Sequence, residues 1–121
     1  MVLGQYSHRN VLPGQSGTIL QNGLVSEYKT SVVLDYSLAR DTMFSKIDGH
    51  QDSLECIYTG MKLYMSPGQD PTEAVYLNGI NNGINTEHTW PQAKGASGNA
   101  QSDMHHLYPT RTKANSDRGN N

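Results

Sequence analysis

Three short blocks of polar residues near the end of the chain contain groups that could cleave a phosphodiester bond. They are residues 85–92, 102–110 and 115–120, which read NTEHTWPQ, SDMHHLYPT and NSDRGN. Hydrolysis needs a base that takes a proton from water, a cation that neutralises charge on the phosphate and the leaving oxygen, and groups that hold the backbone. The blocks hold three of the five histidines beside carboxylate, amide and guanidinium groups. They predict metal-dependent phosphodiester cleavage.

The first block places Glu87 next to His88. Histidine suits the role of base because its ordinary pKa, about 6.5, leaves it neutral at working pH. Neighbours on a strand point to opposite faces, so this pair can share a site only where the strand ends, bends or bulges. Pro91 supports such an end because it cannot donate to a strand ladder. Taken singly, Glu87 also fits a solvated carboxylate, and His88 a hydrogen-bonded histidine without a role in catalysis.

The third block fits a helix that starts at Thr112 or just after it. Asn115 is unfavourable inside a helix, which suggests a task for its side chain, and Arg118 lies three residues on, on the same face. One carboxylate with one amide suits Mg²⁺, which prefers oxygen ligands and keeps several waters. The guanidinium of Arg118 could grip a phosphate, or it could lie on a solvated helix face.

In this order the three blocks resemble the signature of the bacterial endonuclease I family, a branch of the His-Me finger (ββα-metal) nucleases. The specific match covers residues 83–121. Residues 36–48 and 53–58 resemble the helical lead-in and the strand of that family less specifically. The resemblance implies an α+β fold, with a helical lead-in, short strands, and a finger of β-hairpin plus helix at the C-terminal end.

The resemblance also implies roles for single residues. His88 is expected to be the general base, while Glu87 and Asn115 bind the divalent metal, Mg²⁺, with Mn²⁺ or Ca²⁺ as alternatives. Arg118 is expected on the phosphate side or as a supporting residue, and His106 as a buttress of the site that is no ligand. The implied substrate is DNA, with RNA as a second class, cut with low sequence specificity. Family members are usually exported, which implies a secreted or periplasmic location, although the first residues show no signal peptide.

Two departures from the family pattern stand out. There is no arginine between Lys94 and Asp103, where some relatives place one that helps the leaving side. The chain also ends at Asn121, within the first turns of the expected metal-binding helix. We therefore expect a domain that is truncated at its C-terminal end.

Length, net charge, cysteine content and apolar runs limit the classes of protein to which the chain can belong. A chain of 121 residues fits one domain or part of one. The formal net charge of -2 counts mildly against nucleic-acid binding, although residues 85–121 are slightly positive. Cys56 is the only cysteine, which excludes an intrachain disulfide and a cysteine zinc site; we expect a buried apolar filler. No apolar run approaches the roughly 18–20 residues of a membrane span, so no membrane partner is expected.

Apolar spacing predicts the supporting elements. We expect a loose lead-in over residues 1–16 and a domain over 17–121, with the finger at about 83–121. A helix over 18–28 would present a core stripe, and a second helix capped by Ser37 would run to about Ile47. Alternation predicts strands at 54–58 and 61–65, and residues 94–99 a short flexible link. The first stripe is formed by Leu20, Leu24 and Tyr28, and the second by Ala39, Met43 and Ile47.

Two other functions are compatible with the same residues. A zinc-stabilised, non-catalytic binding module could use His88, His105 and His106, because three imidazoles suit zinc. Adjacent His105 and His106, however, diverge on a strand or helix. An inactive nuclease fragment that only folds or binds DNA is the other alternative. Tight stoichiometric zinc would indicate the module, whereas nuclease activity with weakly bound Mg²⁺ would indicate the enzyme.

Overall fold

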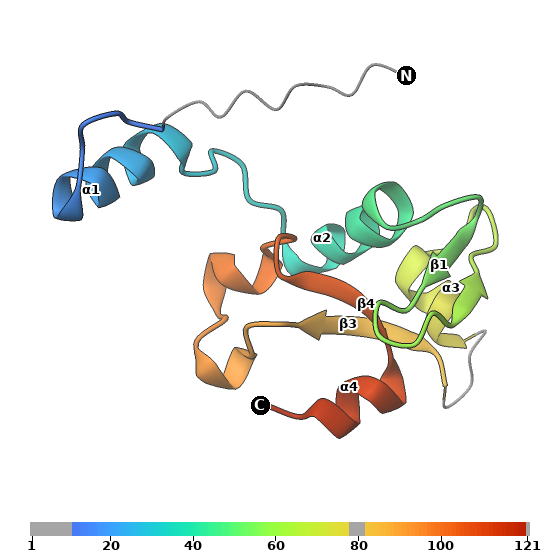
Figure 1. Ribbon diagram of the computed structural model, residues 1–121. Helices are drawn as coiled ribbons and strands as arrows, with labels where there is room; N and C mark the ends of the chain where they lie inside the picture. Colours follow the sequence, from blue (N-terminus) through green and yellow to red (C-terminus); the bar gives the residue numbers. More distant parts are fainter. Residues whose placement is uncertain (1–10, 78–81, 121) are drawn as a thin grey trace, which may run out of the picture. The chain divides into compact units, whose positions relative to one another are not determined.

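The computed structural model describes residues 11–77 and 82–120, and the chain divides into two compact units, Met1–Val32 and Val33–Asn121. The first unit contains helix α1, Gly17–Tyr28 (Figure 1). The helix is where the sequence predicts it, but none of its residues is buried. The predicted core stripe of α1 is therefore wrong. Its apolar side chains are not confined to one face, because Ile19 and Val25 lie off the stripe and are also exposed.

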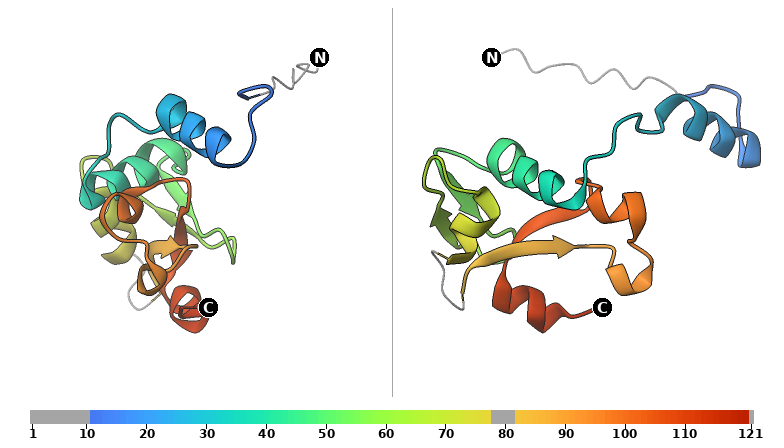
Figure 2. Two further views of the ribbon diagram at one scale, coloured as in Figure 1. Left: turned by 90° about the vertical axis from the view of Figure 1, so that its left-hand side faces the viewer. Right: turned by 180° about the vertical axis from the view of Figure 1, so that it is seen from behind.

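The second unit is a mixed α+β structure, as predicted. Two two-stranded antiparallel sheets are combined with short helices. Helix α2 lies on one side of the β3–β4 pair and α4 on the other (Figures 1 and 2). The elements are α2 Tyr36–Thr42, the π-helix η1 Met43–Ile47, β1 Ser53–Glu55, β2 Lys62–Tyr64, α3 Pro71–Leu77, β3 Ile84–His88, the 3-10 helices η2 Gln92–Lys94 and η3 Gly98–Ser102, β4 Leu107–Arg111 and α4 Thr112–Arg118.

One hydrophobic cluster joins these elements. Its buried members come from η1, α3 and three strands, and from the residue after β1. Cys56 is 1% exposed and belongs to this cluster, which confirms its prediction as a buried filler. The members are Met43, Phe44, Leu54, Cys56, Val75, Ile84 and Leu107.

Helix α2 starts and continues differently from the prediction. Its cap is Asp35, whose Oδ1 accepts the N–H of Leu38 at 3.0 Å, and not Ser37. Farther on, the N–H of Asp48 bonds to the carbonyl of Met43 at 2.8 Å, as in a π-turn. Because a π-turn is wider than an α-turn, Ile47 leaves the face of Ala39 and is 52% exposed, while Phe44 is buried.

The first hairpin is shorter than predicted. β1 ends at Glu55, and the chain then turns, with the N–H of Gly60 bonded to the carbonyl of Cys56 at 2.9 Å. Gly60 has a φ of 68°, in the left-handed region that favours glycine. Tyr58 is consequently 51% exposed and lies in the turn rather than in a strand. The alternation after Gly60 is confirmed, since Met61, Leu63 and Met65 pack against the core.

The C-terminal part forms the predicted hairpin and helix. β3 pairs antiparallel with β4, with Ile84 opposite Arg111 and His88 opposite Leu107. Helix α4 begins at Thr112. The connection between the strands is more regular than the predicted flexible link, because it contains η2 and η3. Within the described part of the chain, the helices are too short or too polar to cross a membrane. Residues 1–10 of the predicted lead-in lie outside the described residues, and the 1–16 and 17–121 boundaries stay predictions.

Candidate active site

A cavity of about 250 Å³ lies between the end of β3 and the inner face of α4. Glu87 and His88 line it from the strand, and Asn115 and Arg118 line it from the helix. β3 ends at His88, as expected for a strand whose last two residues share a site. Four of the five predicted site residues thus surround one space. The fifth, His106, is a neighbour of His88, with ring centroids 5.7 Å apart.

Glu87 is a buried carboxylate with unused oxygens. Its side chain is 1% exposed, and neither Oε1 nor Oε2 has a hydrogen-bond partner. The guanidinium of Arg118 approaches Oε1 as an ion pair, but not with hydrogen-bond geometry. Burial raises the pKa of Glu87, and the charge of Arg118 opposes that rise. Arg118 already offsets part of the cost of burying this charge, and the lone pairs that accept no hydrogen bond can also bind a cation.

Arg118 ties the last turn of α4 to the end of β3. Its Nη1 donates to the carbonyl of His88 at 3.3 Å, and its Nη2 donates to the carbonyl of Thr89 at 3.0 Å. The same guanidinium pairs with Glu87. Arg118 therefore contacts the strand that holds the predicted base and ligand. Its guanidinium nitrogens bond mainly to groups of the protein itself.

Asn115 is oriented by two hydrogen bonds. Its Nδ2 donates to Oδ1 of Asn85 at 2.9 Å and to the carbonyl of Thr86 at 3.1 Å. Both amide hydrogens are used, which leaves Oδ1 as the atom able to bind a cation. The sequence reasoning missed Asn85. It lies two residues before Glu87 and hence on the same face of β3, so that strand periodicity could have identified it.

The tautomer of His88 follows from one contact. Its Nε2 lies 3.1 Å from the carbonyl oxygen of Gln101, and because a carbonyl only accepts, Nε2 must hold the hydrogen. The lone pair is then on Nδ1. The amide nitrogen of Gln92 lies 3.4 Å from the same Nε2 and cannot donate to it in this tautomer. Burial lowers the pKa of His88, the hydrogen bond to Gln101 opposes this, and nearby His106 lowers it further. The imidazole is thus neutral near pH 7.

The family model for Endonuclease I matches residues 14–121 of this sequence. The chain belongs to the Endonuclease I family. It is therefore a nuclease domain, a hydrolase whose substrate class is nucleic acid, and the family is typically metal-dependent. This confirms the resemblance of the three blocks. Comparison with curated proteins and comparison with solved structures each gave no match.

In this Endonuclease I domain the adjacent histidines His105 and His106 lie in different environments. His106 donates from Nε2 to the carbonyl of Ala100 at 2.7 Å. His105 points to solvent, with its side chain 93% exposed, and pairs with Asp103 at 2.7 Å. Among the described residues no group of three His, Cys, Asp or Glu side chains could hold a metal. The zinc module on His88, His105 and His106 is therefore wrong, because His105 pairs with Asp103 in solvent while His106 bonds to the carbonyl of Ala100.

Proposed function

We propose that this domain is a metal-dependent endonuclease that hydrolyses phosphodiester bonds of DNA, and of RNA as a second substrate, with low sequence specificity. The observation that supports the proposal is the shared cavity. In it a neutral imidazole, a buried carboxylate that accepts no hydrogen bond, an oriented amide and a guanidinium come together from β3 and α4. A strand end and a helix of the same finger supply all four groups.

Glu87 and Asn115 are the proposed metal ligands. Both offer oxygen atoms, which suits Mg²⁺, with Mn²⁺ or Ca²⁺ as alternatives. When bound, the ion supplies positive charge against the phosphate and the leaving oxygen. The Asn85 side chain and the Thr86 carbonyl hold the Asn115 amide in one orientation, so its oxygen would be available to a bound cation.

His88 is the proposed general base. Its Nε2–H is held by the carbonyl of Gln101, so Nδ1 can accept a proton from the attacking water. The water oxygen bonds to phosphorus as that proton moves to Nδ1. The ester bond breaks with its electron pair on the leaving oxygen, which takes a proton from solvent. Because burial lowers the pKa of His88, the imidazole is in its proton-accepting form at neutral pH.

Arg118 and His106 are proposed as residues that position the base and the ligand. Arg118 bonds to the carbonyls of His88 and Thr89, so it fixes the strand end. His106 bonds to the carbonyl of Ala100, next to the Gln101 carbonyl that orients the base. A secreted or periplasmic location is part of the proposal and rests on family membership alone.

Plasmid nicking by the purified chain tests this proposal. Nicking with Mg²⁺ that stops with excess chelator and returns with added Mg²⁺ is the expected result. Nicking that continues in excess chelator would contradict the metal requirement. Absence of nicking with Mg²⁺, Mn²⁺ and Ca²⁺, in protein shown to be folded by circular dichroism, would favour the inactive alternative.

A further inference from the structure

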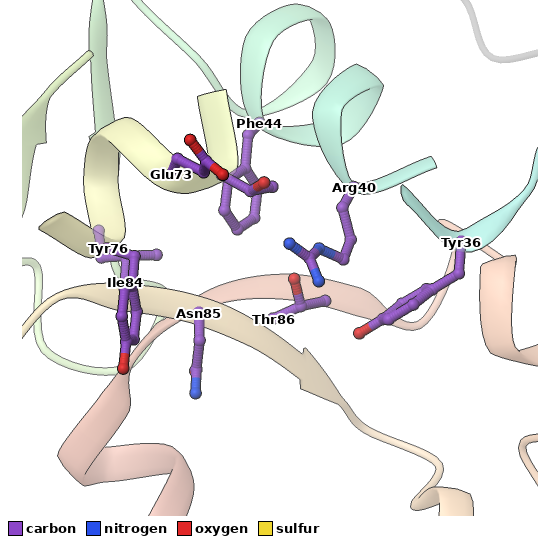
Figure 3. A pocket seen from close by; sticks show the side chains of 9 residues that line it. Tyr36, Arg40, Phe44, Glu73, Tyr76, Ile84, Asn85 and Thr86 are labelled. Carbon is purple, nitrogen blue, oxygen red and sulfur yellow. The ribbon is translucent and has the colours of Figure 1, made fainter. Parts of the chain in front are cut away.

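A second cavity, of about 390 Å³, lies between α2, α3 and β3 (Figure 3). It occupies the α2 side of β3, whereas the candidate active site lies on the α4 side. Thr86 lines both cavities, so the two spaces adjoin through one strand residue. The polar side chains that line the second cavity and could contact a ligand include those of Tyr36, Arg40, Glu73 and Thr86.

Two buried polar atoms at this cavity have no partner. They are Nε of Arg40 and Oγ1 of Thr86. In Figure 3 the guanidinium of Arg40 points toward Thr86, and the side chain of Tyr36 extends from α2 toward β3. Such buried groups are normally hydrogen-bonded, and within the described residues no ion pair is formed by Arg40. The cavity therefore presents converging donors that the protein itself does not use.

These donors suit an anion with several acceptor oxygens. A guanidinium grips phosphate with parallel N–H groups in a fixed fork, and a hydroxyl can donate a further hydrogen bond. The cavity also adjoins the proposed base. The centroid of the Tyr36 ring lies 5.4 Å from that of His88, and Cζ of Arg40 lies 5.2 Å from the Tyr36 ring centroid. Arg40, Tyr36 and His88 thus form a continuous series of contacts.

We propose that this second cavity binds a phosphate of the nucleic-acid strand next to the one that is cleaved, through Arg40 and Thr86. The inference rests on the proposed function, because it names how the same substrate is held. Arg40 is then a positioning residue on α2, far in sequence from the finger. Arg40 supplies a positive charge to the substrate from the second cavity. Arg118 is less able to do so, because its guanidinium is already bonded to Glu87 and to the end of β3.

Glu73 carries a charge opposite to that of Arg40, so the two residues should change the binding affinity in opposite directions. Its carboxylate lines the same cavity and must repel a phosphate bound there. Asp41 and Asp70 lie within Coulombic range of Arg40 without forming an ion pair to it. Loss of the Arg40 charge should therefore weaken binding, whereas loss of the Glu73 charge should strengthen it.

The test measures binding of a short fluorescent DNA duplex to the His88→Ala protein by anisotropy at several salt concentrations. Adding Arg40→Gln should weaken binding about tenfold, which corresponds to the loss of one charge-assisted contact. The slope of log K against log salt should fall by about 0.9, the value for one lost phosphate contact. Glu73→Gln should tighten binding. Lys46→Gln, an exposed lysine of η1 outside the cavity, is the matched control and should change affinity less than about twofold.

Equal affinity and equal salt slope for Arg40→Gln and Lys46→Gln would overturn the proposal. If Arg40→Gln does not fold, Thr86→Val decides, because it keeps the side-chain shape and removes only the hydroxyl. Weaker binding by Thr86→Val would support the phosphate site, and unchanged binding would overturn it. Cleavage by the unmodified chain is scored separately. A chain that binds DNA through Arg40 but never cleaves it would contradict the proposed function while it leaves this site standing.

Discussion

Arg118, in the last turn of α4, forms an ion pair with Glu87, which is buried in β3. The carboxylate side chain is 1% exposed and that of the arginine 24% exposed. Because the same guanidinium also bonds to the carbonyls of His88 and Thr89, the pair joins the helix and the strand end of the finger. This contact makes the stability of the finger depend on the proposed metal ligand.

Arg118→Met should therefore be strongly destabilising. Removing one partner of a buried pair leaves an uncompensated charge and typically costs about 3–5 kcal/mol. Guanidinium unfolding monitored by circular dichroism measures the change. The double variant Arg118→Met with Glu87→Gln should recover most of the loss, since the buried charge is gone. A double variant no more stable than Arg118→Met would contradict this reading of the pair.

Asn115→Ala should reduce nuclease activity and raise the Mg²⁺ concentration needed for half-maximal rate roughly tenfold or more, by analogy with lost metal-site groups. The substitution removes the proposed ligand oxygen and the hydrogen bonds to Asn85 and Thr86. Those bonds also contribute to stability, at about 1 kcal/mol each. Ser116→Ala, at the exposed neighbouring position, is the control. An unchanged Mg²⁺ dependence in Asn115→Ala would exclude Asn115 as a ligand.

His106→Ala should lower kcat by roughly 10–100-fold, with little effect on KM. This is the usual effect of losing a group that orients a reactive side chain. His106 holds the Ala100 carbonyl, and the adjacent Gln101 carbonyl holds the Nε2–H of His88. His106→Asn, which keeps a donor for Ala100, should retain part of the rate. Steady-state kinetics on a defined duplex distinguishes the cases, and a rise in KM with an unchanged kcat would indicate that His106 binds substrate and does not position the base.

Asp70 should make stability depend on pH in the acid range. Its Oδ1 accepts the N–H of Glu73 at 3.0 Å and the hydroxyl of Thr72 at 2.7 Å at the start of α3. The backbone hydrogen bond from Glu73 lowers the pKa of Asp70. A lowered folded-state pKa gives stability that is complete above the unfolded value and is lost as pH falls through the folded value.

Asp70→Ala should consequently be less stable than the parent by about 1 kcal/mol at pH 7, the usual contribution of a helix cap. The difference should shrink as the pH falls below the ordinary aspartate range, because the parent then loses the same contact. Urea unfolding at pH 7 and near pH 3 tests this. A stability difference that is constant or grows toward acid pH would contradict the assigned cap.

The sequence allowed the finger to be predicted better than its surroundings. Adjacent Glu87 and His88 before Pro91 indicated a strand end, and Asn115 and Arg118 indicated one helix face; both geometries are confirmed. The roles of these residues stay predictions. Backbone acceptors such as the Gln101 carbonyl have no side-chain signal, so they could not be predicted. Tyr36 and Arg40 reach the site region from α2 through tertiary packing, which local spacing does not report. The π-turn at η1 likewise departs from the 3.6-residue period on which the Ile47 prediction depended.

Plasmid nicking by His88→Ala, compared with His105→Ala, tests the central claim most directly. His88 is the proposed base, while His105 is a solvent-exposed histidine on the same finger, so the pair controls for loss of an imidazole. We expect His88→Ala to lose about 10²–10⁴-fold in rate, the usual contribution of general-base catalysis. His105→Ala should nick like the parent, and both should keep the circular dichroism spectrum of the parent. Nicking by folded His88→Ala at the parental rate would contradict the assignment of His88 as the base.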